Sequence, residues 1–344
     1  MSYRSIERSD VPLTQQDFAS DQMVKWCPGC GDHAILAAIA KVFPEIGYKK
    51  ESYCIVSGIG CSSRFPYYVN TYGFHSIHGR ANAVATGVRI ANRGLSVWVA
   101  TGDGDSLAIG GNHFIHVIRR NMDLNIMLFN NKIYGLTKGQ YSPTSDLGAV
   151  TKTSPYGTIE QPFLVGELVI GAQGTFFARV IDTNPKFITE VMREAAKHDG
   201  TSVVELLQNC IIFNDETHSL IANKETKDDY QLILRHDEKM IFGKNKDKGI
   251  RMRKNGLEVI NIGPNGEGMD KVLVHDMYNP NPGVHLMLAK MFPPHFPIAL
   301  GVIRAADFPT YDELLEDQIT ESSAKSNIKC VDDLLNSGDT WEIE

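Results

Sequence analysis

Hydrophobic positions follow alternating helical and extended spacings over the first two thirds of the chain. Apolar residues between Ala34 and Val42 recur every three or four positions, which predicts a helix with Asp32 as its N-cap. Unbroken apolar runs predict buried strands, and helical patterns occupy the intervals between them. The predicted strands are 53–57, 95–101, 124–130 and 202–207, and the predicted later helices are 79–93, 107–120 and 185–198.

The segment from 95 to 130 forms the clearest unit, a strand, a turn, a helix and a second strand. This order predicts a βαβ unit, hence an α/β fold with a parallel sheet, helices on both faces and ligands at the carboxyl ends of the strands. Residues 138–178 are rich in Gly, Pro, Ser and Thr and predict long functional loops with one helix near 163–172. Residues 234–256 are charged and expected to be solvated, and one helix is expected between the Pro-rich stretches of 277–304. The region after 307 is acidic.

Composition narrows the class of protein. The 344 residues are 42% hydrophobic and 22% charged, with a net charge of -7, which is typical of a globular protein and disfavours a nucleic-acid surface. No apolar run approaches the roughly 18 residues of a membrane span, and the polar N-terminus has no secretory h-region. We therefore expect a cytoplasmic protein.

A GDGD sequence at 102–105 is followed by Asn131, the second residue of an Asn-Asn pair, 28 residues after Asp103. The two side chains follow neighbouring strands, so a carboxylate and an amide oxygen would meet at one edge of the sheet, as Mg²⁺ bound to phosphate requires. Gly102 and Gly104 would let backbone approach the phosphates, at the start of a helix. The chain has neither a P-loop nor a GxGxxG dinucleotide fingerprint.

Six cysteines occur, and Cys27 and Cys30 form a CPGC motif. By itself this motif is compatible with zinc, a redox dithiol or an iron–sulfur cluster. A second CxxC or an HxxxH for zinc is missing, and a dithiol would leave other cysteines unexplained. Cys61, in a Gly-flanked loop, and Cys210, just after a buried strand, are the candidates to complete four thiolates. Cys54 lies in a predicted buried strand and is expected to pack in the core, whereas Cys330, in the acidic C-terminal region, is expected to bind no cofactor.

Residues 102–145 (GDGDSLAIGGNHFIHVIRRNMDLNIMLFNNKIYGLTKGQYSPTS), together with WCPGCGD, GIGCSSRFP and HGRA, resemble the β subunits of 2-oxoacid:ferredoxin oxidoreductases. The resemblance is strong over about 20–215 and loose beyond. It implies a pyrophosphate-type thiamine-diphosphate fold with Mg²⁺ held by Asp103, Asn131 and the Ile133 carbonyl. It also implies a thiamine site formed by Ile59, Gly60, Cys61, Ser62 and His78, with diphosphate contacts from Gly104, Asp105, Gly135 and Leu136.

The resemblance selects Cys27, Cys30, Cys61 and Cys210 as ligands of a [4Fe–4S] cluster. It further implies thiamine-dependent oxidation of a 2-oxoacid with coenzyme A, with electrons passed to ferredoxin. The family places the thiamine pyrimidine domain on an α subunit, so we expect this chain to be inactive alone, in an αβ pair or its dimer. Arg64 and Lys138 are candidate contacts for substrate or coenzyme A. Two such cations would suit the two carboxylates of 2-oxoglutarate, whereas pyruvate needs one fewer.

The domain organisation expected is an N-terminal arm over 1–25, a cofactor-binding domain over 26–215 and an extension over 216–344. The extension is expected to complete the domain and contact the partner subunit. Three alternatives stay open at this point. They are a pyruvate or broad-specificity 2-oxoacid oxidoreductase subunit, a thiamine decarboxylase or synthase without redox chemistry, and a zinc-stabilised binding module.

Overall fold

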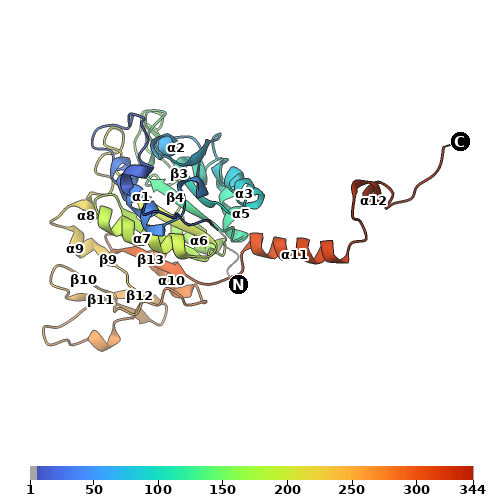
Figure 1. The fold of residues 1–344 in the computed structure, drawn as a ribbon. Coiled ribbons are helices and arrows are strands. Elements are labelled where there is room, and N and C mark those ends of the chain that lie inside the picture. Colours follow the sequence, from blue (N-terminus) through green and yellow to red (C-terminus); the bar gives the residue numbers. More distant parts are fainter. Residues whose placement is uncertain (1–5, 344) are drawn as a thin grey trace.

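The computed structural model describes residues 6–343, and an eight-stranded sheet forms its centre (Figure 1). The strand order is β2-β1-β3-β4-β8-β7-β13-β9. The strands are β1 (Tyr53–Ser57), β2 (Tyr72–His75), β3 (Ser96–Gly102), β4 (Leu124–Asn130), β7 (Phe176–Ile181), β8 (Thr201–Leu207), β9 (Gln231–Ile233) and β13 (Ile298–Ala305). The predicted α/β fold is confirmed, and every pair from β2 to β7 in this order is parallel.

Helices cover both faces of the sheet because successive residues of its buried strands point to opposite sides. Tyr53 and Ile55 join the core beneath α1 and α7, whereas Cys54 and Val56 join the core beneath α3, α5 and α6. The helices of these two layers are α1 (Asp32–Ile46), α3 (Ala81–Ala91), α5 (Gly111–Arg119), α6 (Val165–Gly171), α7 (Pro185–Lys197) and α10 (Gly283–Ala289). The remaining helical turns are η1 (Gln15–Phe18), η2 (Lys50–Ser52), η3 (Ser62–Arg64), α2 (Phe65–Tyr68), α4 (Asp103–Leu107), α8 (Ser219–Ala222), α9 (Lys227–Tyr230) and η4 (Met269–Lys271).

The structure differs from several of the predictions. The helix expected over 107–120 begins only at Gly111, and the residues before it, where a turn was expected, form the short helix α4. The segment expected to be solvated forms a three-stranded antiparallel sheet of β10 (Ile241–Phe242), β11 (Lys248–Arg253) and β12 (Gly256–Asn261), and it buries Phe242 and Ile250. The N-cap of α1 is Gly31 and not Asp32, which is the first helical residue. The sequence pattern also missed β13, which pairs antiparallel with β7.

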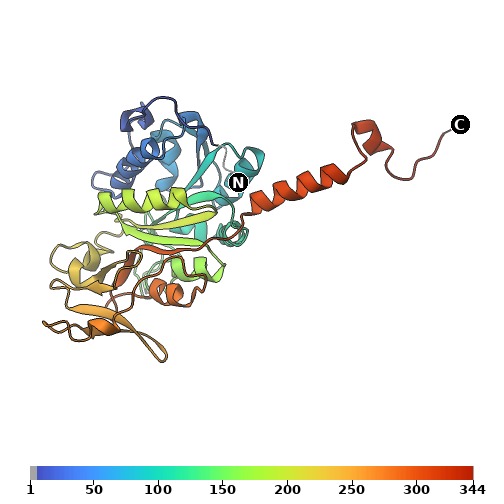
Figure 2. The same cartoon turned by 60° about the horizontal axis from the view of Figure 1, so that its bottom comes forward.

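Both ends of the described chain have defined attachments. Phe18 is fully buried, with its ring 5.5 Å from the rings of Phe43 and Tyr53, so the N-terminal segment is packed on the body. At the other end, α11 (Tyr311–Lys325) and α12 (Val331–Leu335) extend away from the body in both views (Figures 1 and 2). Asp312 fixes the first turn of α11 to the body through buried Arg89, 3.0 Å away.

Within residues 6–343, the helices all fall short of the length and apolar character that a membrane crossing requires.

Candidate active site and cysteine cavity

A cavity of about 480 Å³ opens at the carboxyl edge of the central sheet. Loops that follow β1, β3, β4 and β8 form its wall, as expected for a parallel sheet whose strands end at one edge. The predicted thiamine-site residues that line it are Ile59, Gly60, Cys61, Ser62, His78, Asp103, Gly104, Asp105, Asn131, Ile133, Gly135 and Leu136. The structure therefore gathers these positions, which span 78 residues of sequence, around one space.

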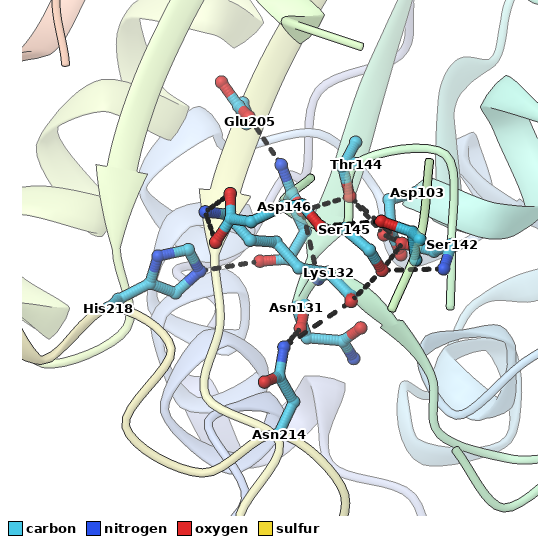
Figure 3. A network of polar contacts seen from close by, with 12 residues as sticks. Asp103, Asn131, Lys132, Ser142, Thr144, Ser145, Asp146, Glu205, Asn214 and His218 are labelled. Carbon is cyan, nitrogen blue, oxygen red and sulfur yellow. Dashed lines mark hydrogen bonds and ion pairs between the residues drawn. The ribbon is translucent and has the colours of Figure 1, made fainter. Parts of the chain in front are cut away.

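Asp103 and Asn131 both line this wall because each directly follows its strand, and the parallel strands β3 and β4 end in register at Gly102 and Phe129. Asp103 Oδ2 accepts hydrogen bonds from Ser142 Oγ (2.5 Å) and Thr144 Oγ1 (2.6 Å), as Figure 3 shows. Burial raises the pKa of Asp103 to about 6, although both hydroxyls act to lower it. A buried carboxylate that is held by neutral donors lacks a positive partner, and a divalent cation would supply one.

The donor set fits Mg²⁺ in chemistry as well as in place. Asp103 supplies a carboxylate, Asn131 an amide and Ile133 a main-chain carbonyl, all oxygen donors of the kind that Mg²⁺ prefers. Asn131 Nδ2 donates to Gln208 Oε1 at 2.8 Å, which orients the amide.

Asp105 ties two loops to the end of β3. Its carboxylate accepts hydrogen bonds from the main-chain N–H groups of Ile59 (3.1 Å) and Gly79 (2.7 Å) and from Thr101 Oγ1 (2.8 Å). It also lies 2.7 Å from His78 Nδ1. With these partners the side chain shapes the cavity wall, so a diphosphate contact from Asp105, which stays a prediction, would fall to its main chain.

Gly104 is required by the ring of Tyr134, which lies directly on it. A Cβ atom at Gly104 would stand 2.2 Å from Tyr134 Cε1, and the tyrosine hydroxyl donates to the Gly104 carbonyl at 3.0 Å. The absence of a side chain at 104 thus lets β5 (Ile133–Tyr134), which pairs with β6 (Gln140–Tyr141), close over the start of α4. This close approach leaves the Gly104 main chain in the cavity wall.

A second, smaller cavity of about 190 Å³ is lined by four cysteines that are far apart in the sequence: Cys27, Cys30, Cys61 and Cys210. All are free thiols. Burial raises the pKa of Cys61 to about 11 and also raises the pKa of Cys30. Across residues 6–343, no three His, Cys, Asp or Glu side chains converge closely enough to ligate one metal ion. The four sulfurs instead surround a space, which is the arrangement that a multi-iron cluster uses.

The two cavities share a wall. Asp32, Cys61, Asn131, Gly135, Leu136 and Gln208 line both of them. At Gly135 this wall is thin, since a Cβ there would lie 3.4 Å from Cys210 Sγ and 3.7 Å from Cys61 Sγ. Gln208 joins the two sites directly, because its Nε2 donates to Cys30 Sγ at 3.3 Å while its Oε1 accepts from Asn131.

The two cationic candidates lie in different places. Arg64 lines the cysteine cavity, where its charge acts to lower the pKa of Cys61 against the larger effect of burial. Lys138 is exposed and has a positive φ of 77°, between Thr137 and Gln140, which line the larger cavity. The structure thus brings Arg64 to the cysteines and leaves Lys138 beside the larger cavity.

Sequence reasoning missed several residues of the site. Ser142 and Thr144 contact Asp103, Tyr134 covers Gly104, and Gln208 bridges the two cavities. The hydroxyl-rich YSPTS segment was a usable signal, but its partner lies some 40 residues earlier in the sequence. The single glutamine after β8 carries no local signal at all.

Comparison with known proteins first gives the class. Residues 58–206 match the family model of the thiamine pyrophosphate enzyme C-terminal domain, which binds that coenzyme. The chain is 45% identical over 342 residues to the 2-oxoglutarate oxidoreductase subunit KorB of Mycobacterium tuberculosis, covering 98% of this chain and 91% of the relative. It is also 45% identical over 185 residues to the 2-oxoglutarate synthase subunit KorB of Archaeoglobus fulgidus, covering 54% and 69% of the two chains.

A solved structure extends the likeness to the whole fold. The 2-oxoglutarate:ferredoxin oxidoreductase of Magnetococcus marinus, solved with 2-oxoglutarate, coenzyme A and succinyl-CoA bound, superposes with a TM-score of 0.77 at 29% identity, covering 98% of this chain and 100% of that one. The chain belongs to the family of KorB and β subunits of 2-oxoacid oxidoreductases. Membership of this family confirms the resemblance and leaves a zinc-stabilised module or a non-redox thiamine enzyme without support.

Proposed function

We propose that this chain is the thiamine-diphosphate-binding subunit of an enzyme that oxidises 2-oxoglutarate with coenzyme A, yielding succinyl-CoA, carbon dioxide and reduced ferredoxin. One observation carries the proposal: the cavity with the Asp103 and Asn131 donors shares a wall with the cavity of four cysteines. A carbon-centred oxidation site and a one-electron acceptor must be neighbours for electrons to pass between them, and this wall meets that need.

Three groups of residues would hold the cofactors. Asp103, Asn131 and the Ile133 carbonyl would bind Mg²⁺, and Gly104, Gly135 and Leu136 would face the diphosphate. Cys27, Cys30, Cys61 and Cys210 would bind a [4Fe–4S] cluster. When bound, thiamine diphosphate supplies a carbon nucleophile and an electron sink for decarboxylation, and an iron–sulfur cluster supplies one-electron transfer.

The chain's own residues prepare this chemistry by positioning. Asp105 holds the Nδ1 side of His78, so the opposite ring nitrogen is available to the cavity. Gln208 links the amide of Asn131 to the sulfur of Cys30, which fixes the spacing between the metal site and the cysteine cavity. Gly135 keeps the wall between them thin, because any side chain there would meet two cysteine sulfurs.

The choice of 2-oxoglutarate is supported by the names of the relatives from M. tuberculosis and A. fulgidus and by the ligands of the M. marinus enzyme. Relatives from Aeropyrum pernix are named only for 2-oxoacids, so pyruvate is the second candidate substrate. Lys138, exposed beside the larger cavity, is proposed to meet substrate or coenzyme A. For Arg64 the same role requires substrate to reach the edge that the two cavities share.

An α subunit is the proposed partner, and the C-terminal segment over 311–344 is its proposed docking element. This segment contains ten acidic and two basic residues, so the remainder of the chain carries a formal charge of +1 against -7 for the whole. Its large apolar residues are exposed, among them Leu334 (59%), Leu335 (71%) and Trp341 (82%). An acidic segment with bare apolar side chains fits a basic surface with an apolar groove on the partner. A cytoplasmic location remains an expectation from composition.

The central experiment is anaerobic co-production of this chain with its α subunit and measurement of low-potential dye reduction. We expect turnover with 2-oxoglutarate and coenzyme A to exceed turnover with pyruvate, and the isolated chain to be inactive. Faster turnover with pyruvate would overturn the substrate assignment. Activity of this chain without its partner would overturn the proposal that the α subunit supplies part of the active site.

Cysteine variants test the cluster separately from activity. Cys210→Ala should lower bound iron and sulfide and the visible absorption of the anaerobic complex, whereas Cys330→Ala, a matched change at an exposed cysteine, should alter none of them. Unchanged iron in the Cys210 variant would remove that ligand from the set.

The docking element is tested with two neighbouring residues of the same segment. Leu335→Asp should weaken co-purification with the α subunit. The control, Asn336→Asp, adds the same charge beside the apolar position and should leave co-purification intact, with equal iron in both variants. Equal co-purification of the two variants would exclude an apolar contact at Leu335.

A further inference from the structure

We propose that Ser142 and Thr144 are positioning residues that clamp one oxygen of Asp103, so that the other oxygen is presented to the metal, and that Asn130, Glu205 and Arg179 anchor this clamp. The inference rests on the proposed function, because it concerns the same metal site. It adds a second set of residues, behind the cavity wall, that decides how well the site binds.

The clamp is formed by two hydroxyls on one carboxylate oxygen. Ser142 Oγ and Thr144 Oγ1 both lie within 2.6 Å of Asp103 Oδ2 (Figure 3), and the main-chain N–H groups of Asp103 and Gly104 also act on this carboxylate. Ser142, Thr144 and Asp103 are each about 2% exposed. Each hydroxyl has one hydrogen to give, and the charged oxygen is its strongest acceptor. Because both hydroxyls bond Oδ2, we expect Oδ1 to be the oxygen that is offered to a cation in the cavity that Asp103 lines.

The loop that carries the clamp is itself held rigidly. Ser145 Oγ accepts from the Ser142 main-chain N–H at 2.8 Å and donates to the Lys132 carbonyl at 2.6 Å. Lys132 Nζ then pairs with Asp146 at 2.8 Å, as Figure 3 shows. Ser145 and Asp146, at the C-terminal end of this segment, are thus both bonded to Lys132, the residue that follows Asn131.

A buried chain of polar contacts leads from Thr144 into the sheet. The one hydrogen of the Thr144 hydroxyl points mainly at Asp103 Oδ2 and makes a longer, shared bond to Asn130 Oδ1 at 3.0 Å. Asn130 Nδ2 in turn donates to Glu205 Oε1 at 2.8 Å. Glu205 Oε2 accepts from Arg179 Nε at 2.7 Å, and both ends of this ion pair are essentially inaccessible to water. The side-chain amide of Asn130 has its oxygen toward Thr144, because the Lys132 main-chain N–H also donates to that oxygen at 3.2 Å.

The adjacent residues Asn130 and Asn131 therefore have different roles. Along an extended strand, neighbouring side chains point to opposite sides, so Asn131 faces the cavity while Asn130 faces Glu205 in the sheet. Residues that hold a metal ligand in place commonly change metal affinity by ~10–100-fold when removed. We expect that range for Thr144, whose hydroxyl connects the clamp to the anchor.

The test measures metal binding and not turnover. Mn²⁺ binding to the anaerobic, oxidised α/β complex saturated with thiamine diphosphate is followed at room temperature through the EPR signal of free Mn²⁺. Thr144→Val, which removes the hydroxyl and keeps the shape, should weaken Mn²⁺ binding by about tenfold or more. Thr144→Ser should restore binding to within about threefold, and Ser142→Ala should weaken it to a similar degree as Thr144→Val.

Two further variants separate the possible outcomes. Thr158→Val makes the same substitution elsewhere in the loop region, at a buried threonine that bonds Asp146 and Gly148 and does not contact Asp103, so its Mn²⁺ affinity should be unchanged. Asp103→Asn should abolish Mn²⁺ binding. If Asp103→Asn binds Mn²⁺ normally, the proposed metal site itself fails. If Asp103→Asn abolishes binding while Thr144→Val and Ser142→Ala bind normally, the clamp alone is wrong.

Visible absorption from the iron–sulfur cluster reports whether each complex is assembled. A Thr144→Val complex that keeps this absorption and loses Mn²⁺ affinity supports positioning over a general structural role. Should Thr144→Val fail to assemble, the Ser142→Ala and Thr144→Ser pair decides the question: weak binding in the first with normal binding in the second supports the clamp, and any other result overturns it.

Discussion

Replacement of Gly104 by alanine tests whether the Tyr134 ring, and not backbone conformation, demands glycine at this position. The new Cβ would lie 2.2, 2.5 and 2.8 Å from three atoms of the ring. Gly104 sits in α4 without a positive φ, so alanine by itself suits the backbone there. The ring is therefore the one feature expected to make the substitution unfavourable.

The magnitude follows from three effects. Overpacking against this half-buried ring costs roughly 1–3 kcal/mol, and loss of the Tyr134 hydroxyl bond to the Gly104 carbonyl costs about 1 kcal/mol. Alanine in a helix gains up to about 1 kcal/mol over glycine. We expect Gly104→Ala to lower the free energy of unfolding by about 1–3 kcal/mol and to weaken thiamine diphosphate binding, because the displaced ring lines the cavity.

The assay is urea unfolding of the anaerobic full-length chain in two backgrounds. In Tyr134→Ala the obstruction is gone, so adding Gly104→Ala should be neutral or stabilising by up to about 1 kcal/mol, a reversal of sign. Gly87→Ala is the matched control, since this glycine lies inside α3 with nothing within 4 Å of a new Cβ. Equal destabilisation in both backgrounds would refute the reasoning.

Two further predictions concern stability. Arg89→Met removes a buried guanidinium that pairs with Asp123 at 2.7 Å and with Asp312 at 3.0 Å. The free energy of unfolding should therefore fall by about 3–5 kcal/mol, and limited proteolysis should cleave the chain faster near the start of α11. Unchanged cleavage would show that other contacts hold α11. Burial lowers the pKa of His218 to about 4, whereas the pKa of an unfolded histidine is near 6.5. Between these values the unfolded chain binds a proton that the folded chain does not, so the free energy of unfolding should fall by about 1.4 kcal/mol for each pH unit from 6.5 down to 4. His218→Gln should make the free energy of unfolding depend less steeply on pH between 4 and 6.5, as measured by urea unfolding at several pH values. An equally steep dependence in both proteins would contradict this role of His218.

Features that depend on local pattern can be predicted from the amino-acid sequence alone. Buried strands such as 124–130 are apolar throughout because helices cover both faces, and this pattern is visible without any partner. The pairing of Asp103 with Asn131 was also predictable, since parallel strands joined by a short crossover end at the same edge. From those two elements follow the position of the cavity and the oxygen donors of the proposed Mg²⁺ site.

Which distant segments meet could be learned only from the folded chain. Strand β13 joins the sheet antiparallel to β7, although it lies more than 100 residues later, and nothing in its own sequence states its partner. The contacts of Ser142 and Thr144 with Asp103, the bridge made by Gln208 and the place of Arg64 beside the cysteines depend likewise on how loops pack. A local pattern records whether a residue is buried, because burial follows from the face of its own element. The identity of its neighbour depends on every chain segment packed around it, and for that reason the clamp on Asp103 emerged only from the folded molecule.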